Sequence, residues 1–298
     1  MKKLMKFQSN LFILISSFAL LFGYGLDLNT NFQLLLLALI FVVLLGVPHG
    51  SLDVLFAIQT FDLKQLKHWL KFIGSYVIAA LLVISIWLIA PNIFFVCFLL
   101  LSALHFSDDL NLIDFKALKL SYGALIITLP SLLFSHELID LYAMIIDIKT
   151  STYLVEASKF ITVPGGLYLT LMLFNKKIGI RTKLETFSVC ALFLLLHPIL
   201  AFSIYFCGMH SARHLIRSHF FLRKFTKRAF LNALIFPTIA VIILGIFTWL
   251  MAENKTLEVE MIRIIFIGLA ALTVPHAWVL QKSNFQAWLI TRKFKDDY

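Results

Sequence analysis

Charged residues are scarce in this sequence. Only 14% of the 298 residues are Asp, Glu, Lys or Arg, whereas 60% are hydrophobic and the mean hydropathy is +0.92. Water-soluble globular chains carry about 25% charged and about 45–50% apolar residues. The composition therefore excludes an intrinsically disordered chain, a coiled coil and an ordinary water-soluble enzyme. It predicts a polytopic membrane protein with its core in lipid.

Cysteine is rare as well. Cys97, Cys190 and Cys207 are the only three, and no CxxC motif occurs. Each lies within an apolar run, which indicates small buried residues rather than thiolate ligands of a metal.

Apolar runs of about 20 residues, the length that crosses the hydrocarbon of a bilayer, recur along the chain. They predict ten transmembrane helices, at 8–26, 31–59, 68–90, 92–110, 117–135, 153–174, 182–197, 199–222, 228–251 and 258–281. The seventh and eighth are separated at His197-Pro198, because proline interrupts a helix and restricts the residue before it. A single helix across this point, giving nine in total, is the alternative. The segment 136–152 is expected to be a longer outer loop.

The basic residues distinguish ten helices from nine. With ten, both termini share one side, and the segments on that side hold 21 of the 26 Lys and Arg residues. The opposite loops hold only Lys149 and Lys255. Because positive residues stay in the cytoplasm, both termini are predicted to be cytoplasmic, in a bacterial-type inner membrane. This topology accounts for the formal charge of +10 without a nucleic-acid partner.

Five of the nine histidines lie well inside predicted helices, where ionisable side chains are costly and usually face the bundle interior. They are His49, His105, His210, His214 and His276. Their four helices all run from outside to inside, and at about 1.5 Å per residue the five positions fall at a similar depth. The other four histidines are interpreted as interfacial or capping residues.

The spacing of these histidines predicts a metal site inside the bundle. His210 and His214 are four residues apart, so they share one helix face and can bind one metal together. HxxxH alone is a weak signal, but His49 and His105 at matching depth would complete a site of four imidazoles. His276, which follows Pro275, is expected near the site without binding the metal. A fifth ligand, a substrate-side residue and an ordinary core histidine are the alternatives for it.

Two aspartates lie four residues after two of these histidines. Asp53 follows His49, and Asp109 follows His105. Each is expected to accept the distal imidazole N–H and so orient a ligand, with an aspartate solvated at a helix end as the alternative. Arg213 is expected to form an ion pair with Asp53 or Asp109.

Imidazole ligands suit zinc, copper, iron and nickel. Four of them leave open positions on a five- or six-coordinate metal, as O₂ activation by Fe(II) requires, whereas zinc with four histidines would be a closed structural site. A pair on one helix cannot ligate both faces of a haem, and the sequence has no HxxHH box of the kind that membrane desaturases need. Thirty phenylalanines offer surface for a long apolar substrate.

The motifs, taken in order, resemble those of one enzyme family. Pro48-His49-Gly50-x-x-Asp53, His105-Phe106-x-x-Asp109, His210-x-x-Arg213-His214 and Pro275-His276 are similar to the Brp/Blh family of membrane β-carotene 15,15'-dioxygenases. The resemblance covers about residues 40 to 280, and the helix 8–26 lies outside it. Ser107 stands where glycine is expected, a change that bears mostly on packing.

The resemblance implies cleavage of the central 15,15' double bond of β-carotene with O₂ by an iron(II) enzyme. The products would be two molecules of all-trans-retinal, supplied to a microbial rhodopsin. It also implies that His49, His105, His210 and His214 are the metal ligands. A non-catalytic carotenoid- or retinal-binding membrane protein and a divalent metal transporter are the alternative functions.

The predicted fold class is therefore all-α, a transmembrane bundle of about ten helices with a metal site inside it. The chain is expected to form one integral membrane domain over residues 1–298. It would comprise an N-terminal helix (8–26), a metal-binding helical core (31–281) and a cytoplasmic tail (282–298).

The predicted orientation can be tested with a reporter fused after Tyr298. A reporter that works only in the cytoplasm should be active there. Activity of a reporter that works only outside the cell would contradict the placement of the C-terminus.

Overall fold

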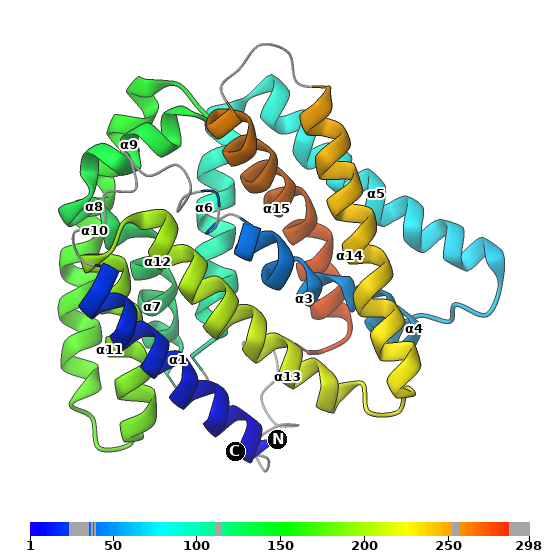
Figure 1. The fold of residues 1–298 in the computed structure, drawn as a ribbon, viewed down its shortest axis with the longest axis horizontal. Helices are drawn as coiled ribbons and strands as arrows, with labels where there is room; N and C mark the ends of the chain where they lie inside the picture. Colours follow the sequence, from blue (N-terminus) through cyan, green and yellow to red (C-terminus); the bar gives the residue numbers. More distant parts are fainter. Residues whose placement is uncertain are drawn as a thin grey trace.

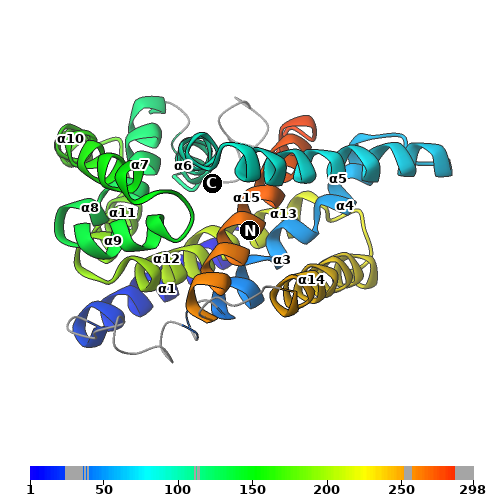
Figure 2. The same cartoon turned by 90° about the horizontal axis from the view of Figure 1, so that it is seen from above.

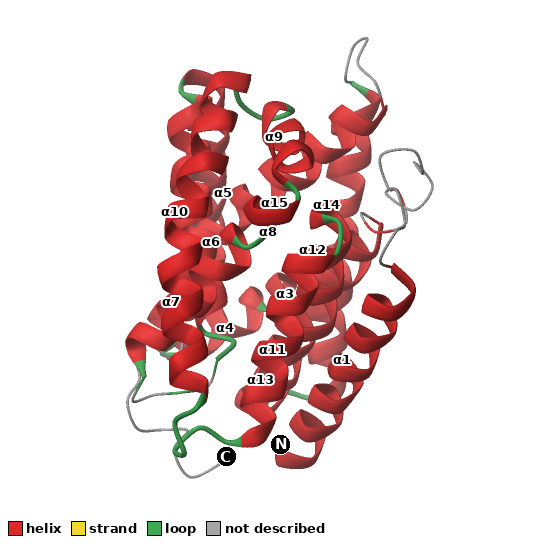
Figure 3. Ribbon diagram, turned by 90° about the vertical axis from the view of Figure 1, so that its left-hand side faces the viewer, coloured by secondary structure: helices red, strands yellow, loops and turns green. Residues whose placement is uncertain are grey.

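The computed structural model describes residues 1–23, 36, 38, 40–110, 112, 115–251 and 257–285 of the chain. The described residues form helices joined by short turns, with no strand among them (Figure 1, Figure 3). The all-α prediction is confirmed.

The helices follow one another closely along the chain. They are α1 (Lys2–Gly23), the π-helix η1 (Val42–Gly46), α3 (Pro48–Ser51), α4 (Asp53–Thr60), α5 (Leu66–Ile89), α6 (Pro91–Ser107), α7 (Lys116–Thr128), α8 (Pro130–Leu133), α9 (Ser135–Ala143), α10 (Ile148–Leu173), α11 (Ile180–Leu195), α12 (Pro198–Tyr205), the π-helix η2 (Phe206–Ser211), α13 (Ala212–Phe221), α14 (Lys227–Leu250) and α15 (Leu257–Lys282). Abutting helices such as α12, η2 and α13 form one continuous rod. Counted in this way, the described part of the chain has 11 helical segments.

One segment was not among the ten predicted helices, and it corrects the expected loop at 136–152. Residues Ser135–Ala143 form α9. Leu138 and Tyr142 lie one turn apart on this helix and pack into a core cluster, where the ring of Tyr142 contacts Phe95 at a centroid distance of 4.7 Å. Burial of this apolar stripe explains why the segment is helical.

The predicted separation at His197-Pro198 is confirmed. α11 ends at Leu195, Leu196 has extended backbone angles, and α12 begins with Pro198 at its first position. The ring of His197 accepts a hydrogen bond from the backbone N–H of Ile199, so this histidine caps α12. A nine-helix chain with one continuous helix here is excluded.

Within the described residues, six helical segments are long and apolar enough to cross a membrane. They are Lys2–Gly23, Val42–Thr60, Leu66–Ile89, Lys116–Leu133, Lys227–Leu250 and Val259–Lys282. In α5 and α14 only 6% of the apolar window is buried inside the protein, so these two helices present Leu, Ile and Val to their surroundings. Apolar surface of this extent indicates a membrane protein.

α15 runs through the middle of the bundle (Figure 1, Figure 2). On one side of it lie α7 to α11, and on the other lie α5 and α14, as both views show. Its residues Ile267 and Ala270 belong to the same buried cluster as Phe94 and Phe95 of α6. Its last turns pack against α4 and α14 through Val279 and Leu280. α15 therefore joins the two sides and places one of the five histidines at the centre.

A glycine lets α6 and α7 approach closely. A Cβ atom on Gly123 of α7 would lie 2.0 Å from the carbonyl oxygen of Ala103 in α6, so no larger residue fits without moving the backbone. Ala103 lies two residues before His105. The contact therefore fixes the position of the helix that carries this histidine.

We predict that Gly123→Ala destabilises the protein by about 1–3 kcal/mol, because the added methyl group meets backbone. Gly74→Ala on α5 is the matched control, since nothing lies within 4 Å of its Cβ position. That control should be neutral or stabilising by up to about 1 kcal/mol. Unfolding of the detergent-solubilised protein, followed by circular dichroism, measures both. Equal stability of the two variants would contradict the close contact.

Candidate metal centre

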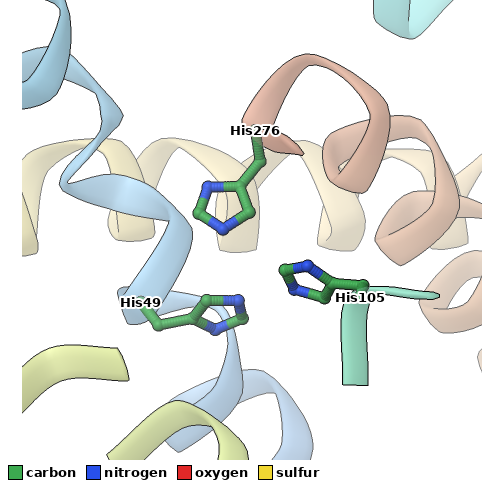
Figure 4. Close-up of side chains that lie close together, drawn as sticks. All are labelled: His49, His105 and His276. Carbon is green, nitrogen blue, oxygen red and sulfur yellow. The ribbon is translucent and has the colours of Figure 1, made fainter. Parts of the chain in front are cut away.

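The structure brings five histidine rings together around one point. They come from five elements: His49 from α3, His105 from α6, His210 from η2, His214 from α13 and His276 from α15. The ring centroid of His49 lies 5.1 Å from that of His210, and 5.2 Å from those of His214 and His276. His105 lies 4.7 Å from His210 and 5.7 Å from His276. Figure 4 shows His49, His105 and His276 pointing towards a common centre.

Several ring nitrogens in this cluster are buried without a partner. Among the described residues, no hydrogen bond reaches Nε2 of His210, His214 or His276, or Nδ1 of His105. One nitrogen each of His49, His105 and His276 lies within 4.8 Å of the others. A buried polar atom without a partner costs roughly 1–3 kcal/mol. A single metal cation that accepts the lone pairs would satisfy several of these atoms at once, so the donor set fits a metal.

Two aspartates orient two of the rings. Nδ1 of His210 lies 3.0 Å from Oδ2 of Asp109, and Nδ1 of His276 lies 2.7 Å from Oδ1 of Asp53. Both carboxylates are buried and accept hydrogen bonds, so each Nδ1 carries the proton. Nε2 of His210 and of His276 then bears a lone pair directed at the cluster.

Each aspartate contacts a histidine of another helix, not the histidine four residues before it. The physical reason is that both helices end within the four-residue interval: α3 ends at Ser51 and α6 ends at Ser107. The i, i+4 geometry therefore does not extend to Asp53 or Asp109. Sequence spacing located the carboxylates near the cluster and gave the wrong partners.

Two tyrosines complete these contacts and were missed in the sequence. The Tyr76 hydroxyl donates to Oδ2 of Asp53 at 2.8 Å, and the Tyr205 hydroxyl donates to Oδ2 of Asp109 at 2.5 Å. Each aspartate is thus held between a tyrosine and a histidine. A tyrosine in an apolar span is common, so only the fold identifies these two.

His49 is oriented by the backbone. Its Nδ1 donates to the carbonyl oxygen of Gly46 and lies 3.2 Å from Oγ of Ser211, which leaves Nε2 for the cluster. Gly46 ends η1, and Ser211 ends η2. π-Helical turns are rare, and those that do occur often lie at functional sites. Here one precedes Pro48-His49 and the other contains His210.

The charge of Arg213 has a different partner from the one expected. Arg213 is buried and donates to Oε1 of Glu185 in α11 at 2.8 Å, and to the backbone carbonyl of Asp109 at 2.8 Å. Gln8 of α1 accepts two further, longer bonds from it. The carboxylate of Asp109 already serves Tyr205 and His210, so Glu185 neutralises the arginine. Glu185 is the only acidic residue of the predicted span 182–197, which was a usable signal.

A large apolar cavity adjoins the cluster. Its volume is about 310 Å³, within the usual range for ligand pockets. His49, His105 and His276 line it together with phenylalanines of α6, α12 and α15. Along α15 the lining residues run from Ile262 to His276, a length of roughly 21 Å at 1.5 Å per residue. On α15 the histidine is the last residue of the lining, and on α6 only Phe106 follows His105.

A second, polar pocket of about 30 Å³ adjoins the cluster. It is lined by His105, His210, His214, Asp108, Asp109, Arg217, Leu280 and Phe285. Only His105 lines both pockets. This explains why His105 is half-buried while the other four rings are buried.

Comparison with known proteins identifies the family of this chain. The sequence model of the family described as beta-carotene 15,15'-dioxygenase matches residues 40–283. The chain belongs to the β-carotene 15,15'-dioxygenase family. The matched region holds all five histidines and leaves out α1, as the resemblance of the motifs indicated.

A curated relative supports the family assignment. The beta-carotene 15,15'-dioxygenase of an uncultured marine bacterium, 66A03, is 26% identical over 253 residues, covering 80% of this chain and 90% of the relative. No solved structure gives a significant match.

We predict that Arg213→Met lowers the free energy of unfolding by roughly 3–5 kcal/mol, because it leaves Glu185 buried without its counter-charge. Arg181→Met is the control: Arg181 also links α11 to α1, through Lys6 and Asn10, but at the surface. It should cost at most about 1 kcal/mol. SDS-induced unfolding in mild detergent measures both variants. The double variant Arg213→Met/Glu185→Met should recover part of the lost free energy of unfolding. A double variant that is no more stable than Arg213→Met alone would contradict the pairing.

Proposed function

We propose that this protein cleaves the central 15,15' double bond of β-carotene with O₂, giving two molecules of all-trans-retinal. The site would be an Fe(II) ion held by His49, His105, His210 and His214. One observation carries the proposal: among the described residues, buried imidazole nitrogens without hydrogen-bond partners gather beside a large apolar cavity. The family assignment names the reaction, and the cavity suits its substrate.

The donor set suits iron. It consists of imidazoles without thiolates, and the two aspartates of the site bind histidine Nδ1 atoms rather than converging on the cluster. Bound Fe(II) would supply O₂ activation at a position that the histidines leave open.

The chain's own residues bind and position the substrate. β-Carotene is a hydrocarbon without any group that needs a hydrogen bond, and the cavity wall is built largely of Phe, Leu, Ile and Val. On α15 the lining runs from Ile262 past Phe266 to His276, so one arm of an extended polyene can lie along it with the central double bond beside the histidines. Holding the reacting bond in this way supplies much of the acceleration.

The reaction needs no general acid or base. One β-carotene and one O₂ contain all the atoms of two retinal molecules, so no net proton or electron is required. The site agrees with this balance, because Asp53 and Asp109 are both engaged by a histidine and a tyrosine. Their role is to hold a proton on Nδ1 of a histidine.

The substrate and product would move through lipid. Phe72, Ile73 and Val77 of α5 and Pro237 and Val241 of α14 line the cavity, and these two helices are the most exposed of the apolar spans. A carotenoid would therefore enter sideways from the bilayer of an inner membrane. Retinal would leave by the same route towards a microbial rhodopsin, with both chain termini in the cytoplasm.

The test is retinal production by the purified protein in detergent, supplied with β-carotene, air and Fe(II). The wild type should yield retinal, measured by chromatography, and should retain iron. His214→Ala should lose both, because it removes a proposed ligand. His136→Ala on α9, away from the cluster, should leave both unchanged.

Two results would contradict the proposal. A His214→Ala variant that is iron-free yet active would remove the metal from the mechanism. A wild type that binds metal or pigment and forms no retinal would favour a metal transporter or a carotenoid-binding protein instead.

A further inference from the structure

We infer that His276 is a fifth imidazole ligand of the metal, held in place by Asp53 and Tyr76. The inference rests on the proposed function and deepens it, because it changes how many positions at the metal stay open. The sequence alone favoured a histidine near the site that does not bind the metal.

The first argument is that His276 is held in the same way as His210. In both residues Nδ1 is bound to a buried aspartate, that aspartate accepts a bond from a tyrosine hydroxyl, and Nε2 is buried without a hydrogen-bond partner among the described residues. Both residues are 3% exposed. If this arrangement presents the Nε2 lone pair of His210 to a metal, it presents that of His276 in the same way.

The second argument is the position of His276 within the cluster. Its ring centroid lies 5.2 Å from His49, 5.2 Å from His214 and 5.7 Å from His105. It is therefore a neighbour of three of the four proposed ligands. Its ring also belongs to the triplet of nitrogens that lie within 4.8 Å of one another, together with His49 and His105.

The third argument concerns the proton on each ring. Asp53 fixes the proton of His276 on Nδ1, so Nε2 can only accept. Nε2 of His49 and of His210 can also only accept, since the Nδ1 atoms of those rings are bound to oxygen acceptors. Ring nitrogens of His49 and His276 lie within 4.8 Å of each other, so two lone pairs meet in an apolar interior without a donor between them. A cation between them resolves this, whereas an ordinary core histidine would face a donor.

The consequence concerns O₂. Five imidazoles leave a single position on a six-coordinate metal, which suffices for O₂ and leaves none for the carotenoid. The substrate would then be held by the cavity wall alone. His276 lines the cavity, so it would stand between the metal and the substrate.

The experiment is a Co(II) titration of the purified, metal-free full-length protein in detergent. The visible absorption of bound Co(II) reports the number of ligands, and competition with a chromogenic chelator gives the affinity. His276→Ala should weaken Co(II) binding at least 10-fold and shift the spectrum. Added free imidazole should restore the wild-type spectrum.

Two isosteric variants test the same point without removing a ring. Asp53→Asn and Asp109→Asn each weaken the orientation of one histidine, and loss of such a contact typically lowers metal affinity 10–100-fold. If His276 is a ligand, both variants lose affinity to a similar extent. If it is not, only Asp109→Asn does, and the inference is wrong. Tyr142→Phe, a tyrosine of the same cavity, should retain wild-type affinity.

The outcomes separate this inference from the proposed function. A wild type that binds no metal and forms no retinal overturns the function. A wild type that does both, with unchanged affinity and spectrum in His276→Ala, overturns only the fifth ligand. Circular dichroism and gel filtration identify a variant that does not fold, and the two aspartate variants then decide.

Discussion

The rest of the site depends on the hydrogen bonds from Nδ1 of His210 and His276 to two buried carboxylates. Inside a membrane, water cannot satisfy a polar group, so every donor and acceptor must find a partner within the protein. Each carboxylate meets this demand with one tyrosine and one imidazole. The imidazole is thereby fixed in one tautomer, and its other nitrogen faces the cluster. The nearby charge of Arg213 is cancelled by Glu185, so it leaves both aspartates to the histidines.

The cluster separates two different environments. On one side lies the apolar cavity, whose wall is hydrocarbon and aromatic surface; on the other lies a polar pocket bordered by Asp108, Asp109 and Arg217. The polar pocket, at about 30 Å³, is large enough to hold a water molecule. Apolar substrate and polar ligands can therefore approach the histidines from different directions. α15 makes this division possible, because it crosses the middle of the bundle and ends beside the cluster.

Much of this arrangement could be predicted from the sequence. The apolar runs and Pro198 predicted where the helices lie. The similar depth of five histidines in parallel helices predicted that these histidines lie together. Contacts across helices could not be predicted, because they depend on where each helix ends. Asp53 and Asp109 were assigned to the histidines of their own helices, although α3 and α6 end before reaching them. α9 was missed since its apolar stripe is short, and Tyr76 was missed since α5 otherwise resembles an ordinary lipid-facing helix. Parts of two predicted segments lie outside the described residues. They are residues 24–35, 37 and 39, from the predicted span 31–59 and the turn before it, and most of the predicted tail 282–298.

The π-helical turn η2 makes the site sensitive to the length of the chain. Tyr205 and His210 are five residues apart, yet both contact the same oxygen of Asp109. In a regular α-helix of 3.6 residues per turn, positions five apart point about 140° away from each other. A π-turn, whose hydrogen bonds span five residues, places them one above the other. The extra residue in this turn therefore acts as a spacer: a deletion of one residue between Tyr205 and His210 would give a more regular helix and a misdirected histidine. Evolution of this helix is thus constrained in the number of its residues as well as in their identity.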